Sequence, residues 1–125
     1  MNLDLSVKKR NIGFSYAWSG IKQAFQEERN FRIHLVSAIL VIMTAGMLRF
    51  QVLEWAILIL VIGQVLVAEL INSAIERMVD YFKPDYHPAA GFIKDVAAGA
   101  VLVAAIIAIM VGSFLFLPKL YDTFM

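Results

Sequence analysis

The fold of this chain is decided by VAAGAVLVAAIIAIMVGSFLFL, residues 96–117, which run for 22 positions without a charged side chain. A bilayer core about 30 Å thick needs roughly 20 helical residues, so this run predicts a membrane-spanning helix. Two further apolar runs precede it. We therefore expect an all-α integral membrane protein, a single domain over residues 1–125, with transmembrane helices at about 33–50, 55–79 and 96–117.

The composition agrees with a membrane protein and excludes several other classes. Apolar residues make up 61% of the 125 positions and the mean hydropathy is +0.75, whereas an ordinary soluble domain is roughly 45–50% apolar. The formal net charge of +1 gives no reason to expect a nucleic-acid partner, and the absence of cysteine excludes disulfides and thiolate chemistry. The sequence also lacks the motifs of soluble nucleotide-binding proteins, zinc proteases and serine hydrolases.

Residues 1–32 form an amphipathic segment ahead of the first apolar run. Apolar side chains recur at helical spacing on one face, at Phe14, Ala17, Trp18, Ile21, Ala24 and Phe25. Polar side chains occupy the other face, as in a helix that lies at a membrane surface. We expect an interfacial helix in this segment.

Basic residues predict the orientation in the membrane. Nine of them lie before the first span or between the second and third spans: Lys8, Lys9, Arg10, Lys22, Arg29, Arg32, Arg77, Lys83 and Lys94. Only Arg49 and Lys119 flank the spans on the opposite side. The positive-inside rule then places the N-terminus and the second loop in the cytoplasm, with a tight external turn at residues 49–54 and the C-terminus outside.

One face of the second span carries an unusual set of polar residues. Glu69, Glu76 and Asp80 fall within about 40° of one another at 100° per residue, and Asn72 lies about 60° to one side. An ionised carboxylate in hydrocarbon costs a few kcal/mol or more, so this face must point to protein, an ion or a water-filled cleft. A purely structural buried network is the weaker interpretation of this set.

The spacing of these carboxylates limits how a metal ion can bind. Glu69 and Glu76 are roughly 10.5 Å apart along the helix axis, so one compact ion is not easily held by both. Glu76 then needs a partner from the acidic residues on the cytoplasmic side, which are Glu27, Glu28, Asp80, Asp85 and Asp95. Oxygen ligands of this kind favour Mg²⁺ over zinc.

Other charged and aromatic residues have simpler interpretations beside functional ones. Lys94 and Asp95 open the third span, where a helix N-terminus would favour phosphate, but they are equally explained as snorkelling charges. His34 is more simply a packed histidine than a ligand. His87 is more simply a residue of the proline-bounded loop.

Three blocks of the sequence resemble the prokaryotic diacylglycerol kinase family. They are ERNFRIH (residues 28–34), ELINSAIERMVD (residues 69–80) and KDVAAGAVL (residues 94–102). The resemblance implies an ATP- and Mg²⁺-dependent lipid kinase that is a homotrimer, with each active site shared between neighbouring subunits. It also implies that Glu69 is the catalytic base and that Glu28 and Glu76 hold the divalent ion.

The same resemblance implies a set of residues at the nucleotide. These are Tyr16, Glu28, Asn72, Glu76, Tyr86, His87, Lys94 and Asp95. The Glu-Arg-Asn block, the His87-Pro88 loop and the Phe-Leu-Pro-Lys exit at residues 116–119 are similar to the branch from Gram-positive bacteria, whose members are mainly undecaprenol kinases. Undecaprenol is therefore the expected substrate, with diacylglycerol as the alternative.

Phosphoryl transfer suits this arrangement, because the protein mainly has to offset phosphate charge, position the reactants and accept a hydroxyl proton. Two alternatives from other classes remain at this point. A small proton-coupled transporter also needs one membrane-embedded glutamate. A non-catalytic membrane adaptor would use the small residues at 97–100 for helix packing.

Overall fold

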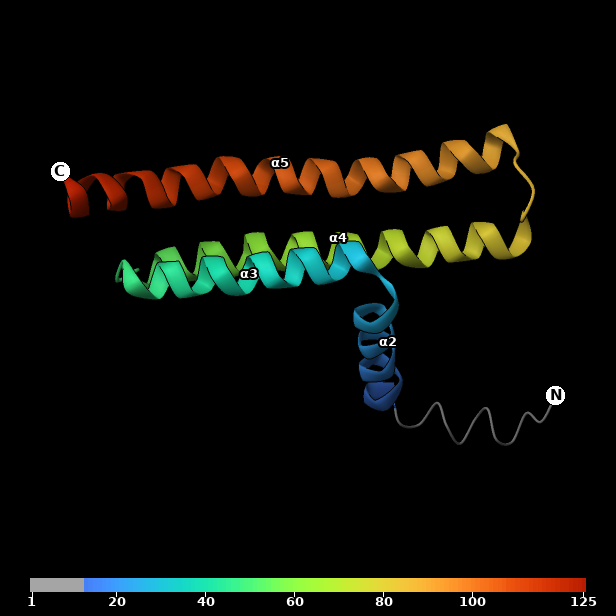
Figure 1. The fold of residues 1–125 in the computed structure, drawn as a ribbon, viewed down its shortest axis with the longest axis horizontal. Coiled ribbons are helices and arrows are strands. Elements are labelled where there is room, and N and C mark those ends of the chain that lie inside the picture. The colour runs from blue at the N-terminus through green and yellow to red at the C-terminus, as the bar shows by residue number, and fades with distance from the viewer. Residues whose placement is uncertain (1–12) are drawn as a thin grey trace.

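The computed structural model describes residues 13–125, and these fold into helices without strands (Figure 1). The helices are α2 (Gly13–Glu27), α3 (Arg29–Met47), α4 (Val52–Phe82) and α5 (Pro88–Phe124). The basic cluster at residues 8–10, which contributes to the predicted orientation, lies outside the described residues. The predicted all-α class is confirmed, with three helices long and apolar enough to cross a membrane.

The three long helices run alongside one another, while α2 runs across their direction (Figure 1). The most extensive packing is between α4 and α5. Small side chains allow this close approach, and Ala97 and Ala104 of α5 are buried. Most other apolar side chains of the three long helices are exposed, as expected for surfaces that face lipid.

The helix ends differ from the ends of the apolar runs because local capping decides where a helix starts and stops. The first long helix ends at Met47, three residues short of the predicted 50, and α4 begins at Val52 after a capping box between Gln51 and Glu54. The third begins at Pro88, eight residues before the charge-free run at 96. At 1.5 Å per residue, α4 and α5 are roughly 45 and 55 Å long and therefore extend beyond a 30 Å core.

A tight apolar cluster closes the end of the bundle at the turn between α3 and α4. Its buried members are Ala45, Phe50 and Leu58. The ring of Phe50 lies 4.8 Å from that of Phe116 and 5.9 Å from that of Trp55, between centroids. The chain reverses through Arg49, whose φ of 57° is left-handed. This cluster fixes how α3, α4 and α5 meet at that end.

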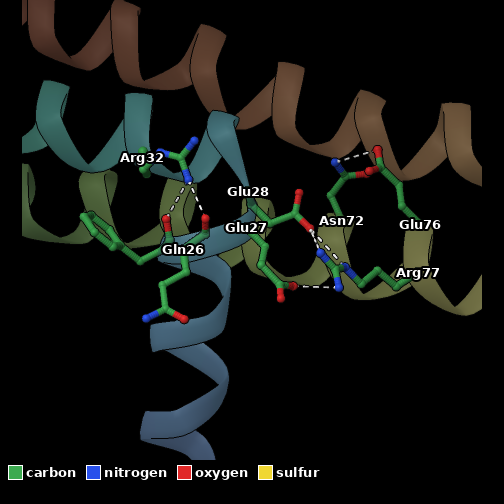
Figure 2. Close-up of polar contacts among 8 residues, drawn as sticks. Gln26, Glu27, Glu28, Arg32, Asn72, Glu76 and Arg77 are labelled. Atoms are coloured by element: carbon green, nitrogen blue, oxygen red, sulfur yellow. Dashed lines mark hydrogen bonds and ion pairs between the residues drawn. The ribbon is translucent and has the colours of Figure 1, made fainter.

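The junction between α2 and α3 is a single residue, Glu28, whose extended backbone (φ −106°, ψ 107°) interrupts the helix. Arg32 spans the break, because its Nη1 donates to the carbonyl oxygens of Phe25 and Gln26 at 2.9 and 3.0 Å (Figure 2). Those carbonyls belong to the last turn of α2 and have no partner inside the helix. Arg32 thereby fixes the direction in which α2 leaves α3.

Candidate active site

The polar face predicted for the second span is buried in the middle of α4, at Glu69 and Asn72, and becomes more exposed toward Glu76 and Asp80. Within residues 13–125 the buried polar side chains are Glu69, Asn72 and Ser73, with exposed fractions of 3%, 6% and 7%. The chain's own helices therefore shield Glu69. The need to shield this carboxylate from lipid is therefore met within one subunit.

Within residues 13–125 Glu69 has one neighbouring side chain that can carry a positive charge. His34 on α3 places its Nε2 3.8 Å from Glu69 Oε2. That distance is too long for a direct hydrogen bond but short enough for an ion pair when the imidazole is protonated. The sequence interpretation of His34 as a packed histidine missed this contact, because pairing between two helices depends on their relative register.

Asn72 lies between Glu69 and Glu76 along α4 and contacts the second of these carboxylates. Its Nδ2 donates to Glu76 Oε1 at 3.3 Å (Figure 2). Its carbonyl oxygen, Oδ1, is buried and has no hydrogen-bond partner among residues 13–125. An unsatisfied buried amide oxygen costs about 1–3 kcal/mol, so its presence in a folded protein calls for an explanation such as a bound ligand or ion.

Glu28 and its neighbour Glu27 contact α4 through Arg77, which lies on the face next to that of Glu69 and Glu76. Arg77 Nε and Nη2 both donate to Glu28 Oε1, at 3.2 and 3.1 Å, and Nη1 lies 2.8 Å from Glu27 Oε2 (Figure 2). Through this contact Glu28 lies against the section of α4 that also carries Glu69 and Glu76.

Arg77 is the residue of this region that sequence reasoning missed, since it served only as a basic flank in the orientation argument. The sequence does contain a signal for Arg77. It follows Ser73 by four residues and Leu70 by seven, so the three share one helix face. That face lines a pocket of about 400 Å³ beneath α2. Ser73 is buried on the same face.

A second polar group lies at the end of α4, next to the loop before α5. Lys94 Nζ and Asp80 Oδ1 are 2.8 Å apart. Around them is a pocket of about 370 Å³. Its polar and aromatic lining consists of Asp80, Lys83, Asp85, Tyr86, His87, Lys94 and Asp95. The expected nucleotide residues of the loop and of α5 therefore do meet in one place.

The expectation that Lys94 and Asp95 sit at a helix N-terminus is wrong. The helix begins at Pro88, so both residues lie in its second turn, away from the free backbone N–H groups. Proline is well suited to the first position of a helix, and His87 Nδ1 accepts a hydrogen bond from Ala89 N at 3.1 Å. His87 is the cap of α5 as well as a lining residue of the pocket.

Tyr16 is the one expected nucleotide residue that the structure does not bring to either group. It lies on α2 with 46% of its surface exposed and lines neither of the polar pockets. The pocket beneath α2 is instead lined by neighbours such as Ala17 and Gly20.

The donor set fits a hard divalent cation such as Mg²⁺. Glu28 and Glu76 offer carboxylates, and the unpartnered Asn72 Oδ1 offers an amide oxygen. Residues 13–125 contain no group of three or more His, Cys, Asp or Glu side chains arranged to hold a metal alone. Mg²⁺ characteristically binds through one or two carboxylates, with water and substrate phosphates as the remaining ligands.

Fold and site together define a class: a small multi-pass helical membrane protein with a buried carboxylate near a pocket of mixed charge. Comparison with known proteins narrows this class. Residues 15–116 match the family described as prokaryotic diacylglycerol kinase. The chain belongs to this family, and it is a membrane lipid kinase whose family membership implies the use of ATP.

Three relatives illustrate the range of the family. A diacylglycerol kinase from Synechocystis is 44% identical over 110 residues, which cover 87% of this chain and 63% of that protein. An undecaprenol kinase from Bacillus subtilis is 41% identical over 107 residues, covering 86% of this chain and 87% of that protein. A diacylglycerol kinase from Escherichia coli is 35% identical over 95 residues, covering 76% and 78%. The family membership favours a kinase over the transporter and adaptor alternatives.

Proposed function

We propose that this protein transfers the γ-phosphoryl group of ATP to the terminal hydroxyl of undecaprenol, producing undecaprenyl phosphate at the cytoplasmic membrane. The observation that carries the proposal is Glu69, a carboxylate only 3% exposed in the middle of a membrane-spanning helix. On one side of it an apolar pocket of about 360 Å³ includes Val65, one turn away. On the other side lie Asn72 and Glu76.

In the proposed reaction Glu69 accepts the proton of the lipid hydroxyl. The oxygen of that hydroxyl forms a bond to the γ-phosphorus, the bond to the bridging oxygen breaks, and ADP leaves. Glu28, Glu76 and Asn72 Oδ1 would hold Mg²⁺, which offsets the negative charge of the phosphates. The low exposure of Glu69 keeps competing water away from the reacting groups.

We place the nucleotide between the two polar groups of the site. The residues proposed to contact it are Tyr16, Glu28, Asn72, Glu76, Tyr86, His87, Lys94 and Asp95. Lys94 supplies a cation for the phosphates once they displace Asp80 from its contact at 2.8 Å. The exposed ring of Tyr86 offers an aromatic surface at the mouth of the same pocket.

The proposed orientation puts α2 and the loop between α4 and α5 in the cytoplasm, where ATP is available. Lys22, Arg77, Lys83 and Lys94 all lie on that side. The proposed assembly is a homotrimer with active sites shared between subunits, which rests on the family resemblance. Native mass spectrometry of the detergent-solubilised protein tests it, and a monomer that retains full activity would contradict shared sites.

Diacylglycerol is the second candidate substrate, with phosphatidic acid as the product. It is favoured by the names of the relatives from Synechocystis and Escherichia coli, at 44% and 35% identity. Undecaprenol is favoured by the Bacillus subtilis relative, of which the alignment covers 87%, and by the blocks similar to the Gram-positive branch. The two lipids present the same reacting group, a primary hydroxyl, which ends an isoprenoid chain in undecaprenol and belongs to the glycerol backbone in diacylglycerol.

A competition assay decides between the two substrates. Purified protein in detergent micelles receives γ-labelled ATP, Mg²⁺ and an equimolar mixture of undecaprenol and diacylglycerol, and the labelled lipids are separated. We expect most of the label in undecaprenyl phosphate. Label mainly in phosphatidic acid would assign the alternative substrate, and label in neither lipid would contradict the kinase proposal itself.

A further inference from the structure

Arg77 lies where α2, α3 and α4 meet, and it belongs to a different face of α4 from the proposed catalytic residues. Its neighbours on that face are Leu70, Ser73 and Ala74, which line the pocket beneath α2. Glu69, Asn72 and Glu76 form the adjacent face. Arg77 is therefore placed beside the site without being part of it.

The guanidinium of Arg77 contacts two consecutive carboxylates at the helix junction. It donates twice to Glu28 Oε1, at 3.1 and 3.2 Å, and lies 2.8 Å from Glu27 Oε2 (Figure 2). The other oxygen of Glu28, Oε2, accepts no hydrogen bond from residues 13–125. Only the planar fork of an arginine can hold two carboxylates in this way, since a lysine ammonium is a point charge.

Within residues 13–125 the Glu28 side chain has no other hydrogen bond or ion pair that would orient it. Its backbone is extended, and its side chain makes no capping hydrogen bond to the start of α3. Arg32 holds the last turn of α2 through backbone carbonyls, at 2.9 and 3.0 Å, and not through Glu28. The contact with Arg77 is thus the interaction that sets where the Glu28 carboxylate lies.

We propose that Arg77 is a positioning residue for the reaction: it orients Glu28 so that the oxygen it leaves unbonded is available to the divalent cation. The inference rests on the proposed function, in which Glu28 and Glu76 hold Mg²⁺. Arg77 also offsets the repulsion between Glu27 and Glu28, which would otherwise move the two carboxylates apart. It touches neither ATP nor the lipid, and acts through Glu28.

The test compares Mg²⁺ activation curves of the full chain in detergent micelles at a fixed ATP concentration. Loss of an interaction that orients a metal ligand commonly costs roughly 10-fold to 100-fold in metal affinity or activity. We expect Arg77→Gln to raise the Mg²⁺ concentration for half-maximal activity about tenfold, with a much smaller change in kcat at saturating Mg²⁺. Arg77→Lys keeps the charge without the fork and should fall between this variant and the wild type.

The matched control is Arg29→Gln, which removes the same charge next to the same junction. Arg29 makes no ion pair within the part of the chain that the structure describes, so its activation curve should stay at the wild-type position. Comparable shifts in Arg29→Gln and Arg77→Gln would overturn the inference, because they would indicate a general effect of charge. A fall in kcat without a shift in Mg²⁺ requirement would overturn it as well.

A double variant separates this inference from the proposed metal site. In a Glu28→Gln background, Arg77→Gln should cause no additional shift, because the group it positions is gone. An additive shift would contradict action through Glu28. If Glu28→Gln alone leaves the Mg²⁺ curve unchanged, the proposed metal site is wrong. Calorimetric titration of Mg²⁺ with ADP provides the same comparison for variants too slow to assay.

Discussion

The start and the middle of α4 hold charged side chains in opposite ways. Near its start, Glu54 lies 3.0 Å from Lys119, which also donates to the Arg49 carbonyl at 3.4 Å and lies 5.8 Å from the centre of the Phe50 ring. Further along α4, Asn72 Oδ1 is buried without a partner, and Glu69 has His34 at a distance of 3.8 Å. The charged groups around Glu54 pair with one another. In the second region Asn72 Oδ1 has no partner among residues 13–125 and is free to bind a ligand.

This difference indicates that the two regions have different roles, one in stability and one in function. Polar groups that satisfy one another around a packed aromatic cluster stabilise the turn between α3 and α4. Carboxylates placed near one another around a buried, unsatisfied amide oxygen cost folding free energy, which is a common property of functional sites. Substitutions around Glu69 should therefore lower activity, whereas substitutions near the turn between α3 and α4 should lower stability.

The largest effect is expected for Glu69→Gln. The substitution preserves shape but removes the group proposed to accept the hydroxyl proton, and general base catalysis commonly contributes about 100-fold to 10,000-fold. Labelled phosphate transfer to lipid should fall by that factor, while ATP binding stays close to the wild-type level. Glu54→Gln makes the same chemical change on the same helix and should retain transfer; equal losses in both variants would refute the assignment of Glu69.

A smaller effect is expected for Glu76→Gln. The amide that replaces the carboxylate is a weaker ligand for a hard cation, and it also alters the hydrogen bond from Asn72 Nδ2. The Mg²⁺ concentration for half-maximal transfer should rise by roughly 10-fold to 100-fold. Activation curves that superimpose on the wild type would remove Glu76 from the proposed metal site.

Lys94→Met is expected to weaken ATP binding by roughly tenfold, the scale of one lost charge-assisted contact. The effect should appear in KM for ATP and much less in kcat at saturating ATP. Lys83→Met is the matched control, because Lys83 lines the same pocket but has no ion pair within residues 13–125. If both lysines change KM to the same extent, Lys94 has no special role at the phosphates.

The smallest effect on activity is expected for Leu58→Ala, at the other end of the bundle. Leu58 is 3% exposed in the cluster with Ala45 and Phe50. Its truncation should cost about 2 kcal/mol of stability, near the low end for Leu→Ala changes, because lipid is as apolar as the protein interior. Thermal unfolding in detergent measures this loss, while phosphate transfer at low temperature should remain at the wild-type rate.

Much of the fold follows from the sequence because the bilayer restricts the choice of structure. Charge-free runs such as residues 96–117 must be helical in lipid, and the periodicity around Trp18 predicts the amphipathic helix that the structure shows as α2. The helix ends were less predictable. Pro88 and the His87 cap start α5 well before the apolar run, through local hydrogen bonds that hydropathy does not report.

The sequence predicts which site residues share a face of one helix. It does not predict which side chains meet between two helices. Glu69, Asn72 and Glu76 share a face of α4 by spacing alone. The contacts of His34 with Glu69 and of Arg77 with Glu27 and Glu28 depend on helix register and on the one-residue break at Glu28. Residues 34 and 69 are 35 positions apart, and no periodicity within a single helix reveals such a pair.

The central claim is that the polar residues around Glu69 form a catalytic centre, while the cluster around Leu58 serves stability. The most direct test measures labelled phosphate transfer and thermal unfolding side by side for Glu69→Gln and Leu58→Ala. The account predicts opposite outcomes: Glu69→Gln loses transfer and keeps the wild-type unfolding temperature, and Leu58→Ala keeps transfer and unfolds at a lower temperature. Retained phosphorylation of both lipids by Glu69→Gln, with transfer lost by Leu58→Ala, would contradict it.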